Sequence, residues 1–337
     1  MRSFLKQAAG LVCLVALACA GCSSGGNDGS GTASGAASSP AQSESSSTSY
    51  APYVSATDAS ATDSAGSPTT YNLAFVISDG SDCTPTWNGT SAIDDAAVKS
   101  RISALTESGA DVRVSFGGAD GKELAETCDS ASALAAAYGA ALDAAGSTQA
   151  DFDIEGDALT DAASIALRSE AIALLQKERT DLQVSFTLPV MPSGLDADSL
   201  ALLESANDNS VAVSTVNIMT MNYSSSYDGD MGDYAITSAK AAHTQLADVF
   251  GLSSENAWYG LALTSMIGVN DVDNETFTLS DAAQVRTFAD EQGIAWVSLW
   301  STFRDQQCED GSANDDAATD CSGVAQSAGA FAEAFAG

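Results

Sequence analysis

The sequence predicts an α/β fold in which eight strand–helix units close into a (β/α)8 barrel, the TIM barrel. Short runs rich in Val, Ile and Phe recur along the 337-residue chain without regular polar alternation, as in parallel strands that are buried on both faces. Amphipathic segments separate these runs, so that strand and helix alternate roughly every 30 to 40 residues, the spacing of a βα repeat. A barrel of this kind carries its active site at the C-terminal ends of its strands.

The strands are expected where the apolar runs lie. The short island YAPYVSAT, which contains Tyr50, Tyr53 and Val54, supplies the first strand. The other seven strands are expected at 71–78, 111–116, 150–155, 182–190, 214–223, 258–263 and 293–301.

The helices are expected between these strands and carry local end signals. The segment 160–179 begins with Thr160 and Asp161 as candidate caps, and another helix begins at Ser280 and stops at Gly293. The competing fold is a doubly wound open sheet, which would normally bind a nucleotide at a glycine-rich turn. Neither GxGxxG nor GxxxxGKS stands after the first strand, so the barrel is favoured.

The N-terminal part predicts export. Residues 1–22, MRSFLKQAAGLVCLVALACAGC, have a basic start and an apolar run that is too short to span a bilayer comfortably. Their end, CAGC, resembles the lipobox of bacterial lipoproteins and predicts a lipid anchor at Cys22, with an ordinary signal peptide as the alternative. Residues 23–48, mostly Ser, Gly, Ala and Thr, predict a flexible tether, and the barrel is expected at 49–337. The protein is then either a cell-surface lipoprotein or secreted.

The charge of the chain limits its partners. The formal net charge is −33, which would repel nucleic acid and anionic lipid. A neutral substrate is therefore expected, with membrane contact only through the lipid anchor. We expect a monomer.

The cysteines predict disulfides and no metal centre. Export of Cys83, Cys128, Cys308 and Cys321 suggests two disulfides with three possible connectivities. None of these cysteines has the close paired spacing of a zinc site, and the single histidine, His243, lies in a helical pattern. Neither a metal, a cofactor nor a His-dependent triad is expected.

The stretch DFDIEG carries the strongest chemical signal. Because side chains alternate along a strand, Asp151, Asp153 and Glu155 share one face, which a barrel would turn into its lumen. In a partly desolvated lumen the three acids cannot all ionise, so burial and like charge raise a pKa and one group keeps its proton. A carboxylic acid beside a carboxylate is what glycoside hydrolysis needs. An edge strand with one wet face and a Mg²⁺ or Ca²⁺ site are the alternatives.

Four motifs together resemble glycoside hydrolase family 18, the chitinases and related endo-β-N-acetylglucosaminidases. DFDIEG is similar to the end of the family's DxxDxDxE signature, although Thr148 stands where its first Asp often lies. The sequence VSFGG resembles the third-strand SxGG motif, MTMNY the sixth-strand motif, and LW the eighth-strand end. The resemblance implies that the residues matching the last three motifs contact the substrate; these are Ser115, Gly117, Gly118, Met219, Met221, Asn222, Tyr223 and Trp300.

Longer runs extend the resemblance over nearly all of 50–337. LAFVISDG, SFTLPVMPSG and SMIGVNDV look like the actinobacterial-type branch of these chitinases. The resemblance also favours the disulfides Cys83–Cys128 and Cys308–Cys321, and the short span of the second makes it plausible on its own.

The resemblance implies a substrate-assisted mechanism with retention of configuration. Glu155 would protonate the glycosidic oxygen and later activate water, while Asp153 would orient the substrate acetamido group with Asp151 as its buried partner. Tyr223 would bond the acetamido carbonyl. Asn222 departs from the family, in which Asp often stands beside this Tyr, so the pH optimum is expected to shift.

The same resemblance makes Trp300 the floor of the −1 sugar subsite, and Trp87 and Tyr227 are further candidate platforms for sugar rings. Trp258 and Trp296 lie inside expected strands and are taken as core residues. The sequence therefore predicts a chitinase. The alternatives are an endo-β-N-acetylglucosaminidase and a catalytically silent chitin-binding barrel, although silent relatives typically lose the glutamate that is present here as Glu155.

Overall fold

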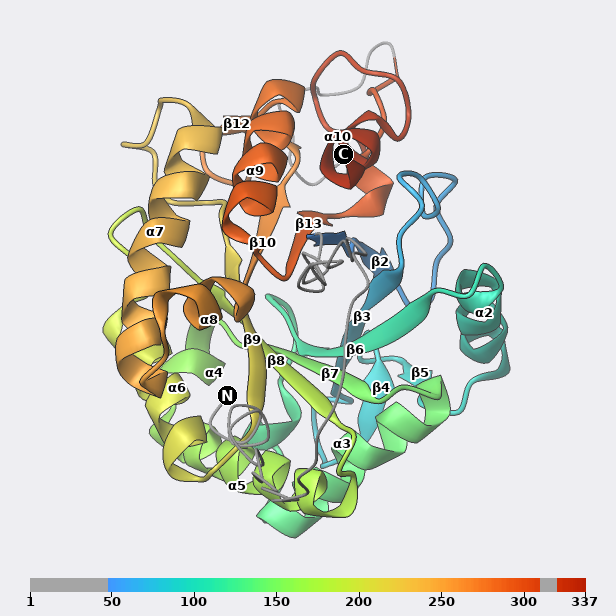
Figure 1. Cartoon of the computed structure of the whole chain (residues 1–337). Coiled ribbons are helices and arrows are strands. Elements are labelled where there is room, and N and C mark those ends of the chain that lie inside the picture. The colour runs from blue at the N-terminus through green and yellow to red at the C-terminus, as the bar shows by residue number, and fades with distance from the viewer. Residues whose placement is uncertain (1–47, 310–319) are drawn as a thin grey trace, which may run out of the picture.

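Eight parallel strands form a closed ring in the computed structural model, which describes residues 48–309 and 320–337 (Figure 1). The first strand is split into β1 (Ser49–Tyr50), which pairs with β13, and β2 (Tyr53–Ser55), which pairs with β3. One short segment thus bridges both ends of the sheet, which confirms the barrel and makes the open-sheet alternative wrong. The ring continues through β3 (Thr70–Ser78), β6 (Asp111–Gly117), β7 (Gln149–Asp153), β8 (Gln183–Pro189), β9 (Val213–Met219), β10 (Leu261–Met266) and β13 (Trp296–Trp300).

The helices surround the ring (Figure 1). The first unit differs from the prediction, because residues 56–69 between β2 and β3 form turns and no helix. The helices are α2 (Ala96–Thr106), α3 (Ala131–Ala145), α4 (Gly156–Thr160), α5 (Ala162–Glu178), α6 (Ala197–Asp208), α7 (Met231–Phe250), α8 (Ser254–Tyr259), α9 (Leu279–Gln292) and α10 (Ala330–Ala336).

Short elements extend the barrel at the ends of its strands. The short strands pair antiparallel: β4 (Pro85–Trp87) pairs with β3 and with β5 (Ser91–Ala92), and β11 (Gly268–Val269) pairs with β12 (Thr276–Phe277). Two 3-10 turns are η1 (Leu124–Glu126) and η2 (Thr302–Arg304).

Helix ends follow their capping residues. Asp161 caps α5 as expected, by accepting bonds from the backbone of Ala163 and Ser164. The start of α9 was placed wrongly at Ser280, since Thr278 caps this helix in a capping box; the helix does end before Gly293.

Trp258 also differs from the prediction, because it lies in the short helix α8 and not in a strand. It stacks on His243 of α7, with ring centroids 3.9 Å apart. The histidine is thus a packing residue, as expected.

The predicted leader at 1–22, with Cys22, lies outside the described residues, as do residues 23–47 of the predicted tether and residues 310–319. Thr48 is buried, and its hydroxyl donates to the carbonyl of Ala289 at 3.0 Å. The packed domain therefore includes one residue that the sequence assigns to the tether. Among the described residues, no helix is long and apolar enough to cross a membrane.

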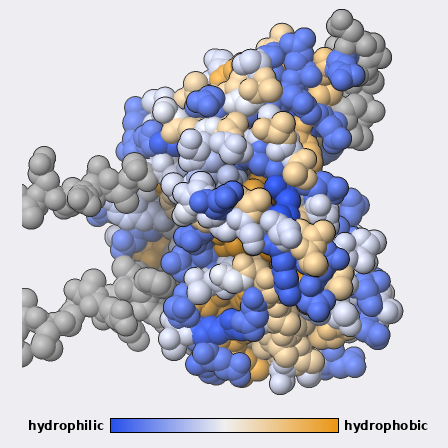
Figure 2. Space-filling model, turned by 90° about the vertical axis from the view of Figure 1, so that its right-hand side faces the viewer, coloured by the Kyte–Doolittle hydropathy of each residue, from blue (hydrophilic) through white to orange (hydrophobic). Residues whose placement is uncertain are grey.

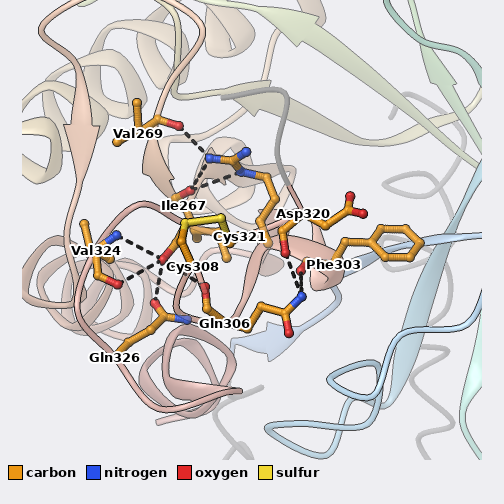
Figure 3. Close-up of a disulfide and its surroundings, with 11 residues drawn as sticks. Ile267, Val269, Phe303, Gln306, Cys308, Asp320, Cys321, Val324 and Gln326 are labelled. Atoms are coloured by element: carbon orange, nitrogen blue, oxygen red, sulfur yellow. Dashed lines mark hydrogen bonds between the residues drawn. A yellow bond between two sulfur atoms is a disulfide. The ribbon is translucent and has the colours of Figure 1, made fainter. Parts of the chain in front are cut away.

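Both disulfides predicted from the resemblance, Cys83–Cys128 and Cys308–Cys321, are present. The second closes the segment that follows η2 and lies beside Ile267 and Val269 (Figure 3). Figure 2 shows a largely hydrophilic face with scattered hydrophobic residues. Of the described residues, Leu174 and Tyr259 are the exposed large hydrophobic side chains.

The outward face of β7 packs on aromatic residues beneath α3. The Phe152 ring lies 5.2 Å from that of Phe116 and 5.0 Å from that of Tyr138, centroid to centroid. Tyr138 Oη donates to the buried carboxylate of Glu123 at 2.6 Å, and Arg168 of α5 forms an ion pair with the same carboxylate at 2.8 Å. This buried pair fixes α3 and α5 against the loop that follows β6.

The buried ion pair gives a stability prediction. Glu123→Gln leaves the Arg168 guanidinium uncompensated in the interior, and we expect the free energy of unfolding to fall by about 3–5 kcal/mol. Asp143→Asn is the matched control, because this carboxylate pairs with Arg179 while 68% exposed and should contribute less than about 1 kcal/mol. Denaturant unfolding measures both variants. If the free energy of unfolding falls by the same amount in both variants, the buried pair has no special role in stability.

Candidate active site

A cavity of about 370 Å³ opens at the C-terminal ends of the barrel strands. Eight strand ends and the loops beyond them converge there, as expected for this fold. The cavity is lined by Tyr53, Phe75, Ala119, Asp153, Glu155, Thr187, Pro189, Val190, Met191, Asp196, Met219, Met221, Asn222, Thr264, Asp271 and Trp300.

Asp151 lies in the lumen below the cavity and is 1% exposed. Its Oδ2 accepts bonds from Tyr53 Oη at 3.0 Å and Ser115 Oγ at 2.7 Å. Its Oδ1 accepts bonds from Ser185 Oγ at 2.7 Å and Thr187 Oγ1 at 2.9 Å. Four hydroxyl donors replace the water that a buried carboxylate has lost, which compensates its desolvation.

Asp153 and Glu155 lie above Asp151 and face the cavity. The strand is shorter than predicted: β7 ends at Asp153, and Glu155 stands in extended conformation just before α4. The wet edge strand is excluded, because β7 pairs with β6 and β8 on its two sides. Side-chain alternation nevertheless continues through residue 155, so the two acids share the cavity.

Burial gives these two acids unusual proton affinities. The pKa of Asp153 is raised well above its ordinary value by burial first and then by Glu155 and Asp151. Burial also raises the pKa of Glu155, with further contributions from Asp120 and Asp271. Asp153 Oδ1 is buried without a hydrogen-bond partner among the described residues. The pair is therefore suited to hold a proton at neutral pH, as a general acid must.

The SFGG stretch packs against the acids and does not line the cavity. The structure therefore does not bring it to the place where the resemblance implies contact with substrate. Ser115 is fully buried and bonds Asp151. A Cβ on Gly117 would lie 2.1 Å from the carbonyl oxygen of Asp153, and one on Gly118 would lie 2.9 Å from the Phe75 ring. Both glycines also have positive φ, so only glycine fits these positions.

Aromatic rings form one wall of the cavity. The rings of Phe75 and Trp300 stack with centroids 5.5 Å apart, and Tyr53 meets Trp300 edge-on at 5.8 Å. The peptide bonds Ala74–Phe75 and Trp300–Ser301 are both cis. The structure thus brings Trp300 to the acids, where a sugar platform was expected.

The residues at and after the end of β9 divide between the cavity and the helix layer. Met219, Met221 and Asn222 line the cavity. Tyr223 does not: it is buried, and its hydroxyl accepts a bond from Ser238 of α7 at 3.3 Å. The Tyr223 ring lies between barrel and helices, so the structure does not bring its hydroxyl to the cavity, where the resemblance implies a bond to a substrate acetamido group.

Two further candidate platforms, Trp87 and Tyr227, do not line the cavity. Trp87 is fully buried, and its indole N–H donates to the carbonyl of Ile93. Tyr227 is half-buried, packs against Tyr223 and Tyr234, and does not line the cavity. Neither indole nor phenol offers a free face to a sugar at this site.

Several residues that line the cavity are not predicted as site residues from the sequence. Tyr53, Phe75, Met191 and Asp271 lie within or beside runs that resemble the family, yet no residue type singled them out. Asp196 caps α6 and also lines the cavity. Within the described parts of the chain, no group of three or more His, Cys, Asp and Glu side chains is arranged to hold a metal ion.

Comparisons with known proteins agree with this geometry, although no family model matches the chain. The "Probable bifunctional chitinase/lysozyme" of Escherichia coli (strain K12) is 35% identical over 277 residues, covering 76% of this chain and 31% of that protein. "Endochitinase 11" of Metarhizium anisopliae is 34% identical over 276 residues, covering 76% of this chain and 52% of that protein. The chain thus spans about a third to a half of the length of these curated relatives.

Solved structures show the same relationship. A family GH18 chitinase from Chromobacterium violaceum shares the fold at a TM-score of 0.53 and 15% identity, covering 78% of this chain and 82% of that one. The catalytic domain of a hyperthermophilic chitinase from Pyrococcus furiosus has a TM-score of 0.74 and 30% identity, and the match covers 85% of this chain and 93% of that one. Because this identity extends over nearly the whole of that domain, the chain belongs to the family of chitinase catalytic domains that includes the Pyrococcus furiosus domain.

Proposed function

We propose that the protein is a chitinase that hydrolyses β-1,4 bonds between N-acetylglucosamine units. One observation carries the proposal: Asp153 and Glu155, both with raised pKa, face one cavity beside the stacked rings of Phe75 and Trp300. This arrangement offers a proton donor, a second carboxylate and a flat apolar surface to a sugar ring. The names of the relatives, a chitinase/lysozyme and an endochitinase, support the same substrate class.

The proposed mechanism uses the substrate's own acetamido group. The acetamido oxygen attacks the anomeric carbon while Glu155 gives its proton to the leaving glycosidic oxygen, and an oxazolinium ion forms. Asp153 accepts a hydrogen bond from the acetamido N–H and stabilises the positive charge of the oxazolinium ion. Glu155, now ionised, takes a proton from water as the water attacks the anomeric carbon, and configuration is retained.

Asp151 supports the two acids from below. Its buried carboxylate is surrounded by four hydroxyl donors and contributes to the raised pKa of Asp153. Because Asp153 is buried, it ionises most easily when positive charge develops beside it. We therefore assign to Asp151 the task of holding the proton on the Asp153–Glu155 pair until substrate binds.

Two alternatives use the same barrel. An endo-β-N-acetylglucosaminidase acting on glycoprotein glycans would share the acids and differ in its substrate. A silent binding barrel would keep the aromatic wall, but the presence of Glu155 in the cavity argues against it. We propose that the protein is exported, with Cys22 as the site of a lipid anchor.

The role of Glu155 is tested by Glu155→Gln, which keeps the shape of the side chain and removes the transferable proton. We expect kcat on N-acetylglucosamine oligomers to fall by roughly 10²- to 10⁴-fold, while oligomer binding is retained. Asp157→Asn, an exposed acid two positions on, is the control and should keep wild-type activity. A glycoprotein substrate is assayed in parallel.

The outcomes separate the alternatives. If the wild-type protein releases sugar from the glycoprotein but not from the oligomers, the endo-β-N-acetylglucosaminidase is favoured. If it releases sugar from neither substrate, the proposal that the protein is an enzyme is wrong. If Glu155→Gln cleaves as fast as wild type, another group is the acid.

The corrected position of Tyr223 gives a second prediction. Tyr223→Phe removes a hydroxyl that contacts Ser238 outside the cavity, so kcat/KM on chito-oligosaccharides should stay within about twofold of wild type. Trp300→Ala removes a cavity-lining ring and should lower kcat/KM at least about tenfold, since a large apolar contact is lost. Equal losses in the two variants would place the Tyr223 hydroxyl on the substrate after all.

The charge of the cavity predicts substrate choice. Asp153, Glu155, Asp196 and Asp271 line it, and no Lys, Arg or His is among the described lining residues. The carboxylates on the peptide stems of peptidoglycan should therefore be repelled, with kcat/KM at least about tenfold below that on neutral chito-oligosaccharides. Carboxyl-reduced peptidoglycan is the control, because it keeps the linkage and loses the charge. If the difference in kcat/KM between the two substrates stays the same at high salt and with carboxyl-reduced peptidoglycan, the electrostatic cause is ruled out.

A further inference from the structure

The hairpin of β11 and β12 brings a third acidic element to the cavity. Its turn carries Asp271, which lines the cavity together with Glu155 and is exposed to solvent. The proposed hydrolysis assigns no task to this residue. Its contacts, however, are specific.

Asp271 and Asn222 form a reciprocal pair across the mouth of the cavity. Asn222 Nδ2 donates to Asp271 Oδ2 at 2.7 Å, and the backbone N–H of Asp271 donates to Asn222 Oδ1 at 3.0 Å. Both ends of the amide are used, so its orientation is fixed. A second contact joins the same two loops, because the backbone N–H of Ser224 donates to the buried carboxylate of Glu275 at 2.9 Å.

The hairpin also makes hydrogen bonds to Arg304 and to the segment that contains Ser322. The backbone N–H of Val269 donates to the carbonyl of Ser322 at 2.8 Å, next to the Cys308–Cys321 disulfide (Figure 3). Arg304 donates to the carbonyl of Val269 at 2.7 Å. The position of Asp271 is therefore set by covalent and hydrogen-bonded supports on one side and by Asn222 on the other.

This geometry also explains the amide at position 222. A carboxylate there would face the Asp271 carboxylate at hydrogen-bond distance without a proton between them, which is repulsive. With Asn at 222, the loop after β9 keeps its bond, and the negative charge resides on the hairpin.

We propose that Asp271 is a positioning residue for hydrolysis, which orients Asn222 on the cavity wall and supplies negative charge to the cavity that Glu155 lines. The proposal rests on the proposed function of the cavity.

The other charged and titratable groups around Glu155 come from four further elements. Asp153 lies on β7, Asp120 on the loop after β6, Asp196 at the start of α6, and Tyr53 on β2. Burial makes the largest contribution to the raised pKa of Glu155. The charge of Asp120 makes the second largest contribution, and that of Asp271 the third. A negative neighbour disfavours ionisation of Glu155, so removing Asp271 lowers its pKa.

The test is a pH profile of kcat/KM on a chito-oligosaccharide. In Asp271→Asn the acid form of Glu155 is lost at lower pH, so the ratio of activity at pH 5 to activity at pH 8 should rise by roughly threefold. The swap Asn222→Asp with Asp271→Asn returns a charge to the wall and should restore the wild-type ratio. Asp273→Asn, an exposed acid on the same turn, is the matched control and should not change it.

A titration that needs no turnover completes the test. Carbon-13 NMR of labelled glutamate follows the Glu155 carboxyl, assigned by its loss in Glu155→Gln, in wild type and in folded Asp271→Asn protein. A midpoint shifted to lower pH supports the proposal even if chito-oligosaccharides prove not to be substrates, which would overturn only the proposed function. Coincident midpoints for wild type and Asp271→Asn, or equal shifts in Asp271→Asn and Asp273→Asn, would overturn the proposal itself.

Discussion

The buried carboxylate of Asp151 is the interaction on which barrel and site both depend. Its four hydroxyl donors come from β2, β6 and β8, so one side chain of the fourth strand fixes the register of the first, third and fifth. Loss of this acceptor would leave several buried hydroxyls unsatisfied. The same charge disfavours ionisation of Asp153 directly above it. A polar group in the lumen thus joins three strands of the ring through its hydrogen bonds.

Much of the barrel could be predicted because its signals are local. Apolar runs, capping residues and the alternation in DFDIEG act within a few positions, and each placed its element within a few residues of the observed bounds. Tyr223 failed for a physical reason. Continued alternation from Met219 would have put it in the lumen, but β9 ends there and Asn222 adopts a φ of 53°, which turns the next ring outward.

The remaining errors come from contacts between distant segments. The pair of Asn222 and Asp271 joins positions 49 residues apart, and a run of residues gives no sign of it. The missing first helix has a similar origin. Asp63 accepts a bond from Thr302 and pairs with Arg101 at 2.7 Å, so tertiary bonds stabilise residues 56–69 where a helix was expected.

The split first strand has a consequence for how the protein is presented to its surroundings. The chain enters β1 beside the start of β13, after Thr48 has packed against Ala289. This is the N-terminal end of every barrel strand, and the cavity opens at the opposite end. The segment before Thr48 therefore joins the domain at the end of the barrel opposite to the cavity. Under the proposed anchoring at Cys22, the junction with the tether and the mouth of the cavity lie at opposite ends of the strands.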